Sequence, residues 1–234
     1  FQHMAKEALQ GIYNRRRIPI IAGGTGFYIQ ALLYDIDFKE NEDGSPVRRE
    51  LEELAAREGE AAPAVLHAML EEIDPESAAR IHANNVKRVI RAIEYYRLTG
   101  RKISVHNQEE RTKESPYDFL YYVVNTERPV LYARIDRRVD QMMENGLVEE
   151  VQTLKSMGCH RGQTSMQGLG YKEILDYLDG RCTLDEAVYV LKRDTRHFAK
   201  RQLTWFKRER DVRWLNLPDF GNDVSLVLDR IIED

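Results

Sequence analysis

The sequence contains little cysteine and no long apolar run. Its two cysteines, Cys159 and Cys182, have no metal-ligand spacing and are too few for a disulfide framework. No segment approaches the roughly 18 uninterrupted apolar residues that a membrane span needs. Residues 1–8 also lack the basic region and apolar segment that mark a signal peptide. These absences predict a cytoplasmic protein with no membrane partner.

The sequence also lacks a large excess of charge of either sign. Lys and Arg number 35, Asp and Glu number 39, and the formal net charge is -4 at pH 7. Any nucleic-acid site is therefore expected to be local, and not a basic coat over the whole surface. With 42% hydrophobic residues, a chain of this length can bury one core and a smaller second module.

Several catalytic motifs are absent, and each absence excludes a class of chemistry. The six histidines form no paired metal-ligand spacing, and no serine or cysteine lies in a nucleophile elbow, so zinc enzymes and triad hydrolases are excluded. The phosphate-loop pattern G-x-x-x-x-G-K-[ST] occurs nowhere in the 234 residues. The residues themselves therefore predict neither a metal site nor this phosphate cradle.

The first forty residues have the order helix, strand, glycine turn, helix. Residues 2–14 carry apolar side chains at helical spacing, and the β-branched run Ile18–Ala22 predicts a short strand. Gly23–Gly26 interrupts this run, and Phe27–Leu33 returns to helical spacing. This order is typical of α/β proteins with parallel strands. Because the sequence starts on a helix without an initiator Met, we expect it to begin inside a domain.

Residues 41–116 are predicted to be inserted into that α/β core. The composition turns polar over residues 39–46, and helical segments follow up to Thr99, one of them with Asp74 as N-cap. Residues 119–124 form the next predicted strand, and a short helix is expected after Trp214 and Leu215. We therefore predict a core of residues 1–40 and 117–234, mostly helical in its second part, and an all-helical insertion of residues 41–116.

The glycine turn is a candidate anion site. Successive backbone N–H groups at the start of a helix attract phosphate, and Thr25 adds a hydroxyl donor between Gly23, Gly24 and Gly26. Glycine turns between a strand and a helix are common, so a purely structural role is an equal alternative.

Residues 192–213 hold nine basic residues against three acidic ones. Helical spacing places one predominantly apolar set on one side: Val188, Leu191, Thr195, Phe198, Gln202 and Trp205. A basic set lies on a neighbouring side: Arg193, Arg196, Lys200 and Lys207. Such a side could hold RNA backbone or a diphosphate leaving group, although a solvated face is the alternative. Gln202 favours a ligand, because a polar amide on the apolar side needs a partner.

A second basic cluster lies in the predicted insertion. It comprises Lys87, Arg88, Arg91, Arg97, Arg101 and Lys102, near Asn84, Asn85, Tyr95 and Tyr96. Basic, amide and aromatic groups together suit single-stranded RNA loops. The alternative is that a tyrosine fills the core while the arginines pair with Glu94. Further on, a set of acidic residues lies on a helix rich in Arg134, Arg137 and Arg138, so ordinary surface pairing is expected for them and not metal binding: Asp136, Asp140, Glu144, Glu149 and Glu150.

The motifs together resemble one family. The blocks that carry the resemblance are Pro19–Tyr28, Asp74–Pro75, Ala79–His82, Asn85, Arg88–Glu94, Leu98–Arg101, Arg134–Val139, Met143, Gly146–Leu147, Gly168–Glu173 and Thr195–Trp205. In this order they closely resemble the bacterial tRNA dimethylallyltransferases. The resemblance implies a P-loop-NTPase-like core with a helical insertion that grips the anticodon stem-loop of tRNA.

The resemblance also implies a reaction and its residues. Dimethylallyl diphosphate meets a flipped-out adenosine just 3′ of the anticodon, and its exocyclic amine displaces diphosphate. Thr25 matches the family's channel threonine, beside Gly23, Gly24 and Gly26. The resemblance places diphosphate contacts at Arg196, Lys200, Arg201 and Gln167. It places tRNA contacts at Arg48, Asn85, Lys87, Arg88, Arg91, Arg193 and Gln202. It further implies Mg²⁺ and a monomer.

Two departures from the family pattern affect these expectations. The family's phosphate loop and the aspartate of its D-S-x-Q-like segment, the proposed base, are absent from these 234 residues. This chain alone is therefore expected to be inactive, with most Mg²⁺ ligands in the missing segment. Gln167 stands where some members have an arginine, whose role would pass to Lys172 or Arg196. The alternatives are an adenylate isopentenyltransferase that acts on free nucleotide, and an RNA-binding fragment without catalysis.

Overall fold

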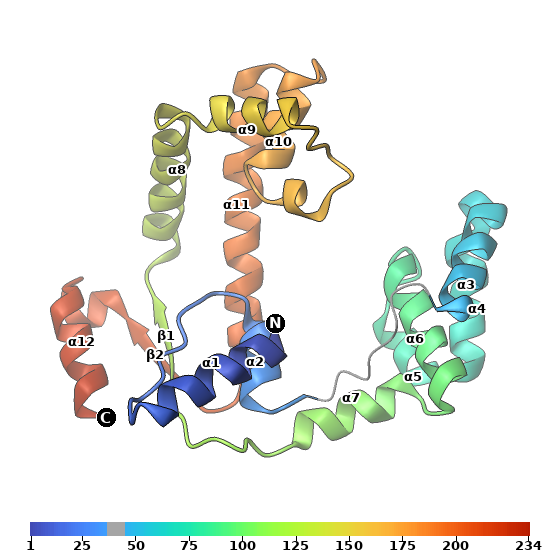
Figure 1. Ribbon diagram of the computed structural model, residues 1–234, viewed down its shortest axis with the longest axis horizontal. Coiled ribbons are helices and arrows are strands. Elements are labelled where there is room, and N and C mark those ends of the chain that lie inside the picture. Colours follow the sequence, from blue (N-terminus) through green and yellow to red (C-terminus); the bar gives the residue numbers. More distant parts are fainter. Residues whose placement is uncertain (37–44) are drawn as a thin grey trace. The chain divides into compact units, whose positions relative to one another are not determined.

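The computed structural model describes residues 1–36 and 45–234 (Figure 1). The chain divides into two compact units, residues 1–22 with 27–118 and residues 23–26 with 119–234. The predicted boundary between residues 40 and 41 lies outside the described residues, and the predicted three-part division stays a prediction. The two units are therefore described separately below.

The first unit is helical. Its elements are α1 (Gln2–Asn14), α2 (Gly26–Leu33), α3 (Pro46–Glu58), α4 (Ala62–Ile73), α5 (Pro75–Arg80), α6 (Val86–Thr99) and α7 (Ile103–Thr112), with a 3-10 turn at Gly59–Ala61. Helices α3, α4 and α6 pack together around Leu51, Leu66, Leu70, Val89 and Ile93, all of them inaccessible to solvent. This apolar cluster is the core of the helical segments that follow residue 45.

Buried polar groups fix the ends of these helices. Asp74 caps α5 as predicted, since its carboxylate accepts bonds from the backbone N–H and hydroxyl of Ser77 at 3.2 and 2.7 Å. The same carboxylate accepts two bonds from Ser104 at 2.9 and 2.7 Å, which joins α5 to α7. Gly100 ends α6, also as predicted, with a φ of 70° that favours glycine.

The second unit contains a two-stranded parallel sheet. Strands β1 (Tyr121–Asn125) and β2 (Val212–Asn216) pair in register from Tyr121 opposite Val212 to Asn125 opposite Asn216. The helices are α8 (Arg128–Glu144), α9 (Leu147–Ser156), α10 (Tyr171–Leu178), α11 (Leu184–Phe206) and α12 (Val224–Glu233), with 3-10 turns at Thr164–Gln167 and Leu217–Phe220. The chain is thus an α/β protein with parallel strands, as the sequence predicts.

Helix α11 is the longest helix of the described chain and lies beside α8 (Figure 1). It begins at a capping box in which the Thr183 and Glu186 side chains bond each other's backbone N–H groups at 3.3 and 2.8 Å. Helices α8 to α11 enclose an apolar core that includes Val139, Val151 and Leu191. The first half of α11 is therefore packed against this core.

Two strand predictions need correction. Residues 18–22 form no strand, and Ile18 and Ile20 are 89% and 88% exposed. A β-branched run becomes a strand only when a neighbouring strand satisfies its backbone, and the described sheet consists of β1 and β2 alone. The sequence prediction also missed β2, because a run of only five residues that includes Arg213 and Asn216 gives a weak signal.

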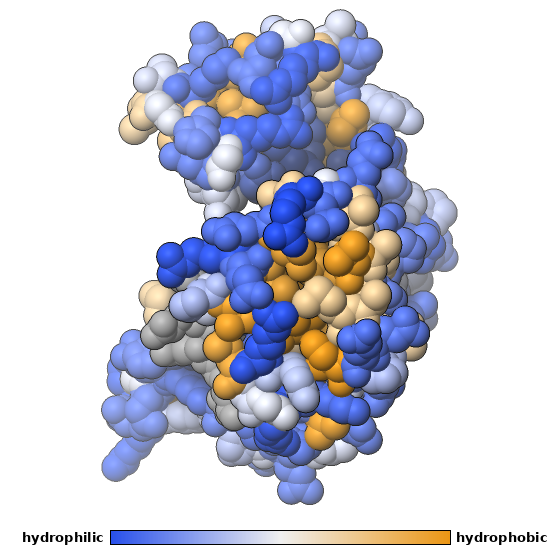
Figure 2. Space-filling view, turned by 90° about the vertical axis from the view of Figure 1, so that its right-hand side faces the viewer, coloured by the Kyte–Doolittle hydropathy of each residue, from blue (hydrophilic) through white to orange (hydrophobic). Residues whose placement is uncertain are grey.

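The surface agrees with the low hydropathy of the sequence. The mean hydropathy is -0.56, and on the face displayed in Figure 2 hydrophilic side chains surround a smaller apolar area. Among the helices of residues 1–36 and 45–234, none combines the length and the apolar composition needed to cross a membrane.

Candidate functional site

A cationic hollow lies on one side of the C-terminal half of α11. Its volume is about 360 Å³, and its lining comes from about three helical turns: His197, Lys200, Arg201, Thr204, Trp205 and Arg208. Lysine and arginine donate charge-assisted hydrogen bonds to phosphate oxygens. The hollow is therefore suited to an anionic group such as a diphosphate or an RNA phosphate.

Four lining residues were not among the sequence-based site residues, namely His197, Thr204, Trp205 and Arg208. A signal for them exists in the sequence, because positions 197, 200, 201, 204 and 208 follow one face of a helix. The basic residues drew attention to charge alone. A search for residues spaced three and four apart on this face would also have found His197 and Thr204.

The Gly23–Gly26 turn packs against the same helix. The side-chain amide of Gln202 donates a hydrogen bond to the carbonyl oxygen of Gly24 at 2.5 Å. A Cβ atom on Gly24 would lie 2.2 Å from Nε2 of Gln202, and one on Gly26 would lie 2.2 Å from Cδ1 of Trp205. These two glycines are thus required by the close approach of α11. The partner that Gln202 was expected to need is the backbone of the turn.

Thr25 lies between the two glycines that α11 holds. Gly26 is buried and Gly24 is half-buried, whereas Thr25 itself is exposed. The indole of Trp205 both contacts Gly26 and lines the cationic hollow. The turn and the hollow therefore share one wall, and the threonine sits on a backbone anchored on either side.

The cations of α11 divide into paired and unpaired ones. Both carboxylate oxygens of Asp136 accept bonds from Arg196 at 2.8 Å, and Arg193 pairs with its neighbour Asp194 at 2.8 Å. Lys200, at the hollow, has no ion-pair partner in the described part of the chain. The Arg201 guanidinium, also at the hollow, lies 5.8 Å from the ring centroid of Phe198, which is itself 41% exposed and not packed as predicted. The predicted diphosphate residues thus split, with Lys200 and Arg201 at the hollow and Arg196 bound to a carboxylate.

The acidic residues of α8 pair across to α11. Asp140 contacts Lys192 at 2.5 Å, and Asp136 contacts Arg196. The ion pairs expected for Asp136 and Asp140 are therefore present, but their partners lie on α11 and not among the arginines of α8. Asp136 and Asp140 lie roughly 60° and 100° around α8 from the buried Val139, both on the same side of it, and their ion pairs show that this side faces α11.

Two carboxyl groups near the hollow have shifted pKa values. Burial raises the pKa of Glu209, and the neighbouring Trp205 and Arg210 only partly offset this shift. The hydrogen bond from Arg193 lowers the pKa of Asp194 despite partial burial. Asp194 is therefore ionised at neutral pH, and its carboxylate neutralises the guanidinium group of Arg193.

Gln167 braces a loop of the second unit. Its amide donates a hydrogen bond to the carbonyl oxygen of Arg161, while the Arg161 side chain pairs with Asp176. Three residues later Gly170 has a φ of 102°, and its N–H donates to the buried Glu173 at 2.9 Å. The described contacts of Gln167 are thus internal to this loop.

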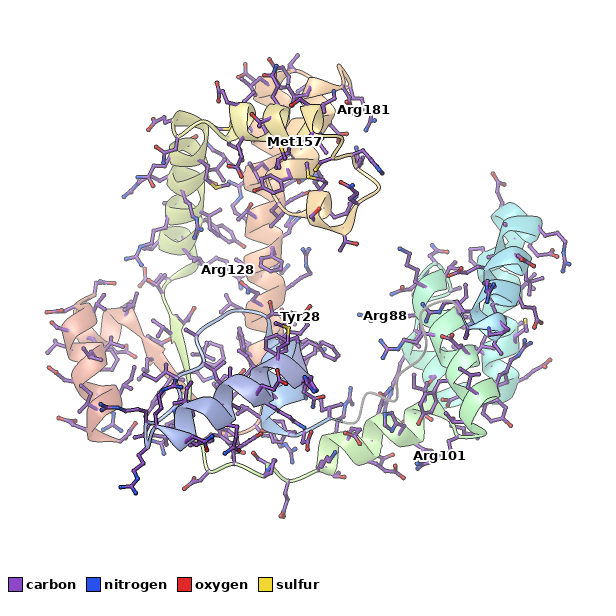
Figure 3. All side chains as sticks on the ribbon, viewed as in Figure 1. Tyr28, Arg88, Arg101, Arg128, Met157 and Arg181 are labelled. Atoms are coloured by element: carbon purple, nitrogen blue, oxygen red, sulfur yellow. The ribbon has the colours of Figure 1, made fainter. Side chains whose placement is uncertain are left out.

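The second predicted basic cluster lies on α6. Lys87, Arg88 and Arg91 are exposed side chains near the start of this helix, and Arg88 is labelled in Figure 3. Asn85 is the N-cap residue of α6, but its side chain makes no capping bond. Tyr95 is buried, which is the structural alternative considered for it. The exposed cations therefore form a short basic strip at one end of α6.

Arg48 has a structural partner. It donates to the fully buried carboxylate of Glu94 at 2.7 Å, and Ser45 donates its hydroxyl at 2.5 Å. Burial favours a raised pKa for Glu94, but the bonds from Arg48 and Ser45 and the charge of Arg91 together lower it. The predicted RNA residue Arg48 is thus also the counter-ion of a buried acid.

The hollow does not fit a magnesium ion. Its lining consists of cationic, hydroxyl and indole groups, whereas Mg²⁺ prefers carboxylate and other oxygen ligands. In residues 1–36 and 45–234, no three His, Cys, Asp or Glu side chains are grouped as metal ligands. The Mg²⁺ expected from the resemblance therefore stays a prediction, and no step below depends on it.

Comparison with known proteins gives a consistent match. Residues 1–209 match the family described as IPP transferase. A protein named tRNA dimethylallyltransferase from Lachnoclostridium phytofermentans is 57% identical over 231 residues, which cover 99% of this chain and 73% of that protein. One of the same name from Acetivibrio thermocellus is 46% identical over 227 residues, covering 97% and 72%.

Solved structures show the same fold. The tRNA isopentenylpyrophosphate transferase of Bacillus halodurans is 40% identical, with a TM-score of 0.65 over 99% of this chain and 71% of that one. A eukaryotic dimethylallyltransferase acting on tRNA is 28% identical, with a TM-score of 0.73 over 92% of this chain and 55% of that one.

Proposed function

This chain belongs to the IPP transferase family, and from that premise we propose that it transfers a dimethylallyl group from dimethylallyl diphosphate to the exocyclic amine of the adenosine 3′ of the anticodon in tRNA. The names of the relatives support the reaction, and the relative acting on tRNA supports the substrate. The observation in this chain that carries the proposal is that Trp205 both lines the cationic hollow and contacts Gly26 of the Gly23–Gly26 turn.

The proposed step is a displacement at the allylic carbon. The lone pair of the adenosine amine forms a bond to this carbon, and the carbon–oxygen bond to diphosphate breaks with its electrons on the oxygen. The amine then loses a proton to a base, which the family resemblance assigns to the aspartate of a segment absent from these 234 residues. Negative charge grows on the leaving diphosphate, so cations beside it lower the barrier.

Each site residue has a proposed role in this step. Lys200 and Arg201 line the hollow and hold the diphosphate while its charge increases. Thr25 donates its hydroxyl to a phosphate oxygen, and the N–H groups of the Gly23–Gly26 turn add further donors. Trp205 forms the apolar wall beside them. Gln202 keeps the turn in place through Gly24 and has no direct RNA contact in this scheme.

Removing the two cations of the hollow should slow transfer. We expect Lys200→Ala with Arg201→Ala to lower the rate of prenyl transfer roughly 100-fold, because donors to the developing charge are lost. The measurement is single-turnover transfer to an anticodon stem-loop by a chain completed with the part of the Lachnoclostridium relative outside the matched region. Lys207→Ala is the matched control, since Lys207 is exposed at the end of α11 but does not line the hollow. Equal rates in both variants would contradict the role of the hollow.

The strip on α6 is proposed to bind the RNA backbone. We expect Arg88→Ala with Arg91→Ala to weaken binding of an anticodon stem-loop and to reduce the salt slope by about 0.7 to 0.9 per lost phosphate contact. Titrations at several salt concentrations give this slope. The control is Arg57→Ala with Arg80→Ala, which removes two exposed arginines that pair with Glu58 and Glu76. An unchanged slope in the α6 variant would remove this strip from the interface.

Free adenylate is the competing acceptor. The relatives' names favour tRNA. The exposed strip of Lys87, Arg88 and Arg91 also favours tRNA, because a mononucleotide is not needed to explain several neighbouring cations whereas an RNA backbone is. Competition of AMP with a stem-loop for binding separates the two acceptors. Displacement of the stem-loop by an equal concentration of AMP would favour the free nucleotide as acceptor. If the completed chain binds RNA but transfers no prenyl group, the protein is an RNA-binding protein without catalysis.

A further inference from the structure

The segment after α11 folds back against the last turn of that helix. Arg208 donates its backbone N–H to the carbonyl oxygen of Trp205 at 2.9 Å, and Glu209 donates its own to Phe206 at 3.3 Å. Each bond joins residues three positions apart, so the chain turns more tightly here than in an α-helix. The Glu209 side chain is thereby brought to Trp205, and the two side chains form a hydrogen bond.

This bond has a defined direction. Tryptophan carries one polar group, the indole N–H, so Trp205 donates and the Glu209 carboxylate accepts. Glu209 is half-buried, whereas Arg208 and Arg210 on either side of it are exposed. Burial raises the pKa of Glu209, and the bond from Trp205 opposes this rise more than the charge of Arg210 does. The carboxyl group is thus held against the indole and not turned to solvent.

Attraction of the substrate does not explain an acid at this place. Trp205 and Arg208 both line the cationic hollow, and Glu209 is bonded to the first and adjacent in sequence to the second. A carboxylate beside a site for anions repels a diphosphate. A contribution of Glu209 to the reaction must therefore come from what its side chain holds in place.

We propose that Glu209 is a positioning residue for prenyl transfer, which fixes the Trp205 indole against the Gly23–Gly26 turn. A Cβ atom on Gly26 would lie 2.2 Å from Cδ1 and 2.4 Å from Nε1 of Trp205. The edge of the indole that donates to Glu209 is therefore also the edge that meets the turn. Rotation of the ring would move the wall of the hollow and the support of the turn together. Glu209 acts through Trp205 and does not touch the substrate, and the inference rests on the proposed function for the reaction itself.

The first test compares two replacements that remove the same charge. E209A removes the acceptor, whereas E209Q keeps an amide oxygen that accepts from the indole. We expect E209A to lower single-turnover transfer by the completed chain about tenfold, through displacement of the turn, and E209Q to recover most of that rate. The control for loss of one negative charge is E144A, since Glu144 is exposed at the end of α8. Equal rates for E209A and E209Q would overturn the proposal, because the lost charge would then be responsible.

A double-mutant cycle connects the effect to Trp205. W205F keeps an aromatic ring but removes the N–H donor, so it should also slow transfer about tenfold, which tests the bond even where E209A is unstable. Because both replacements break one contact, E209A/W205F should transfer at the rate of W205F alone. Effects that multiply in the double variant, or an unaltered rate in W205F, would contradict the role of this bond. Affinity for the stem-loop should be the same in every variant.

Fluorescence reports the position of the indole without any reaction. The sequence has two tryptophans, so W214F leaves Trp205 as the single emitter in the 234-residue chain. In this background we expect E209A to shift the emission to longer wavelength and to increase quenching by acrylamide, and E209Q to change neither. Unchanged emission in a folded E209A protein overturns the inference even where transfer is observed. If the unaltered completed chain transfers no prenyl group, the proposed function fails, while the emission still decides whether Glu209 holds the indole.

Discussion

Replacing Gly26 by alanine is expected to lower prenyl transfer roughly 100-fold, the effect of displacing a reacting group by about 1 Å. The added Cβ would lie 2.2 Å from Cδ1 and 2.4 Å from Nε1 of Trp205, closer than any two such atoms can approach. Either the turn or the indole must therefore move. Both outcomes separate Thr25 from the hollow, because Trp205 belongs to both.

Gly23→Ala is the matched control for this result. A Cβ atom at Gly23 meets nothing within 4 Å, although the residue lies in the same turn. Single-turnover transfer and thermal unfolding are measured for both variants in the completed chain. The expected pattern is a lower rate for Gly26→Ala with Gly23→Ala close to the unaltered protein. Equal rates, with both proteins folded, would show that the position of the turn does not matter for the reaction.

Replacing Glu94 by alanine is expected to lower the free energy of unfolding by about 3 to 5 kcal/mol. Glu94 is completely buried, and its removal leaves Arg48 and the Ser45 hydroxyl without their main acceptor. Chemical denaturation monitored by circular dichroism measures the change. The control is Glu50→Ala, because the ion pair of Glu50 with Arg97 at 3.0 Å is exposed and is worth less than about 1 kcal/mol.

The same carboxylate gives a pH dependence with a defined sign. The pKa of Glu94 is lower in the folded protein than in the unfolded chain, so the folded state binds its proton less readily. Its stabilisation is therefore complete above the unfolded pKa of about 4.3 and is lost as pH falls through the folded value. Glu94→Gln should remove this loss, so its unfolding free energy should fall less steeply below about pH 4.3. Parallel curves for the two proteins would contradict the assignment.

Local signals in the sequence predicted many helix ends and one contact of the site. Asp74 with Pro75, and Gly100 after α6, are positions where the chemistry of a single residue sets the boundary. Gln202 was recognised as an amide in need of a partner, because its place on the apolar side conflicts with its polarity. The sequence alone could not say whether that partner was RNA or Gly24, since the two residues are 178 positions apart.

The errors share a cause, which is that pairing between distant segments overrides local preference. Ile18–Ala22 has strand composition but no strand beside it in the described residues. In contrast, β2 forms because its backbone pairs with that of β1. Likewise, Asp140 has Arg137 nearby on its own helix but binds Lys192 of α11. Spacing within one helix gives the side on which a residue lies, and the neighbouring helix decides its partner.

The bond between Gln202 and Gly24 also has a consequence for the order of folding. It closes a loop of 178 residues, and the pairing of β1 with β2 closes one of about 90. Ordering such long loops costs entropy before the contact returns any stability, whereas helices such as α6 form from neighbouring residues. The Gly23–Gly26 turn should therefore be among the last parts to become ordered. A nascent or partly unfolded chain would already display the α6 strip while the Gly23–Gly26 turn is still unformed.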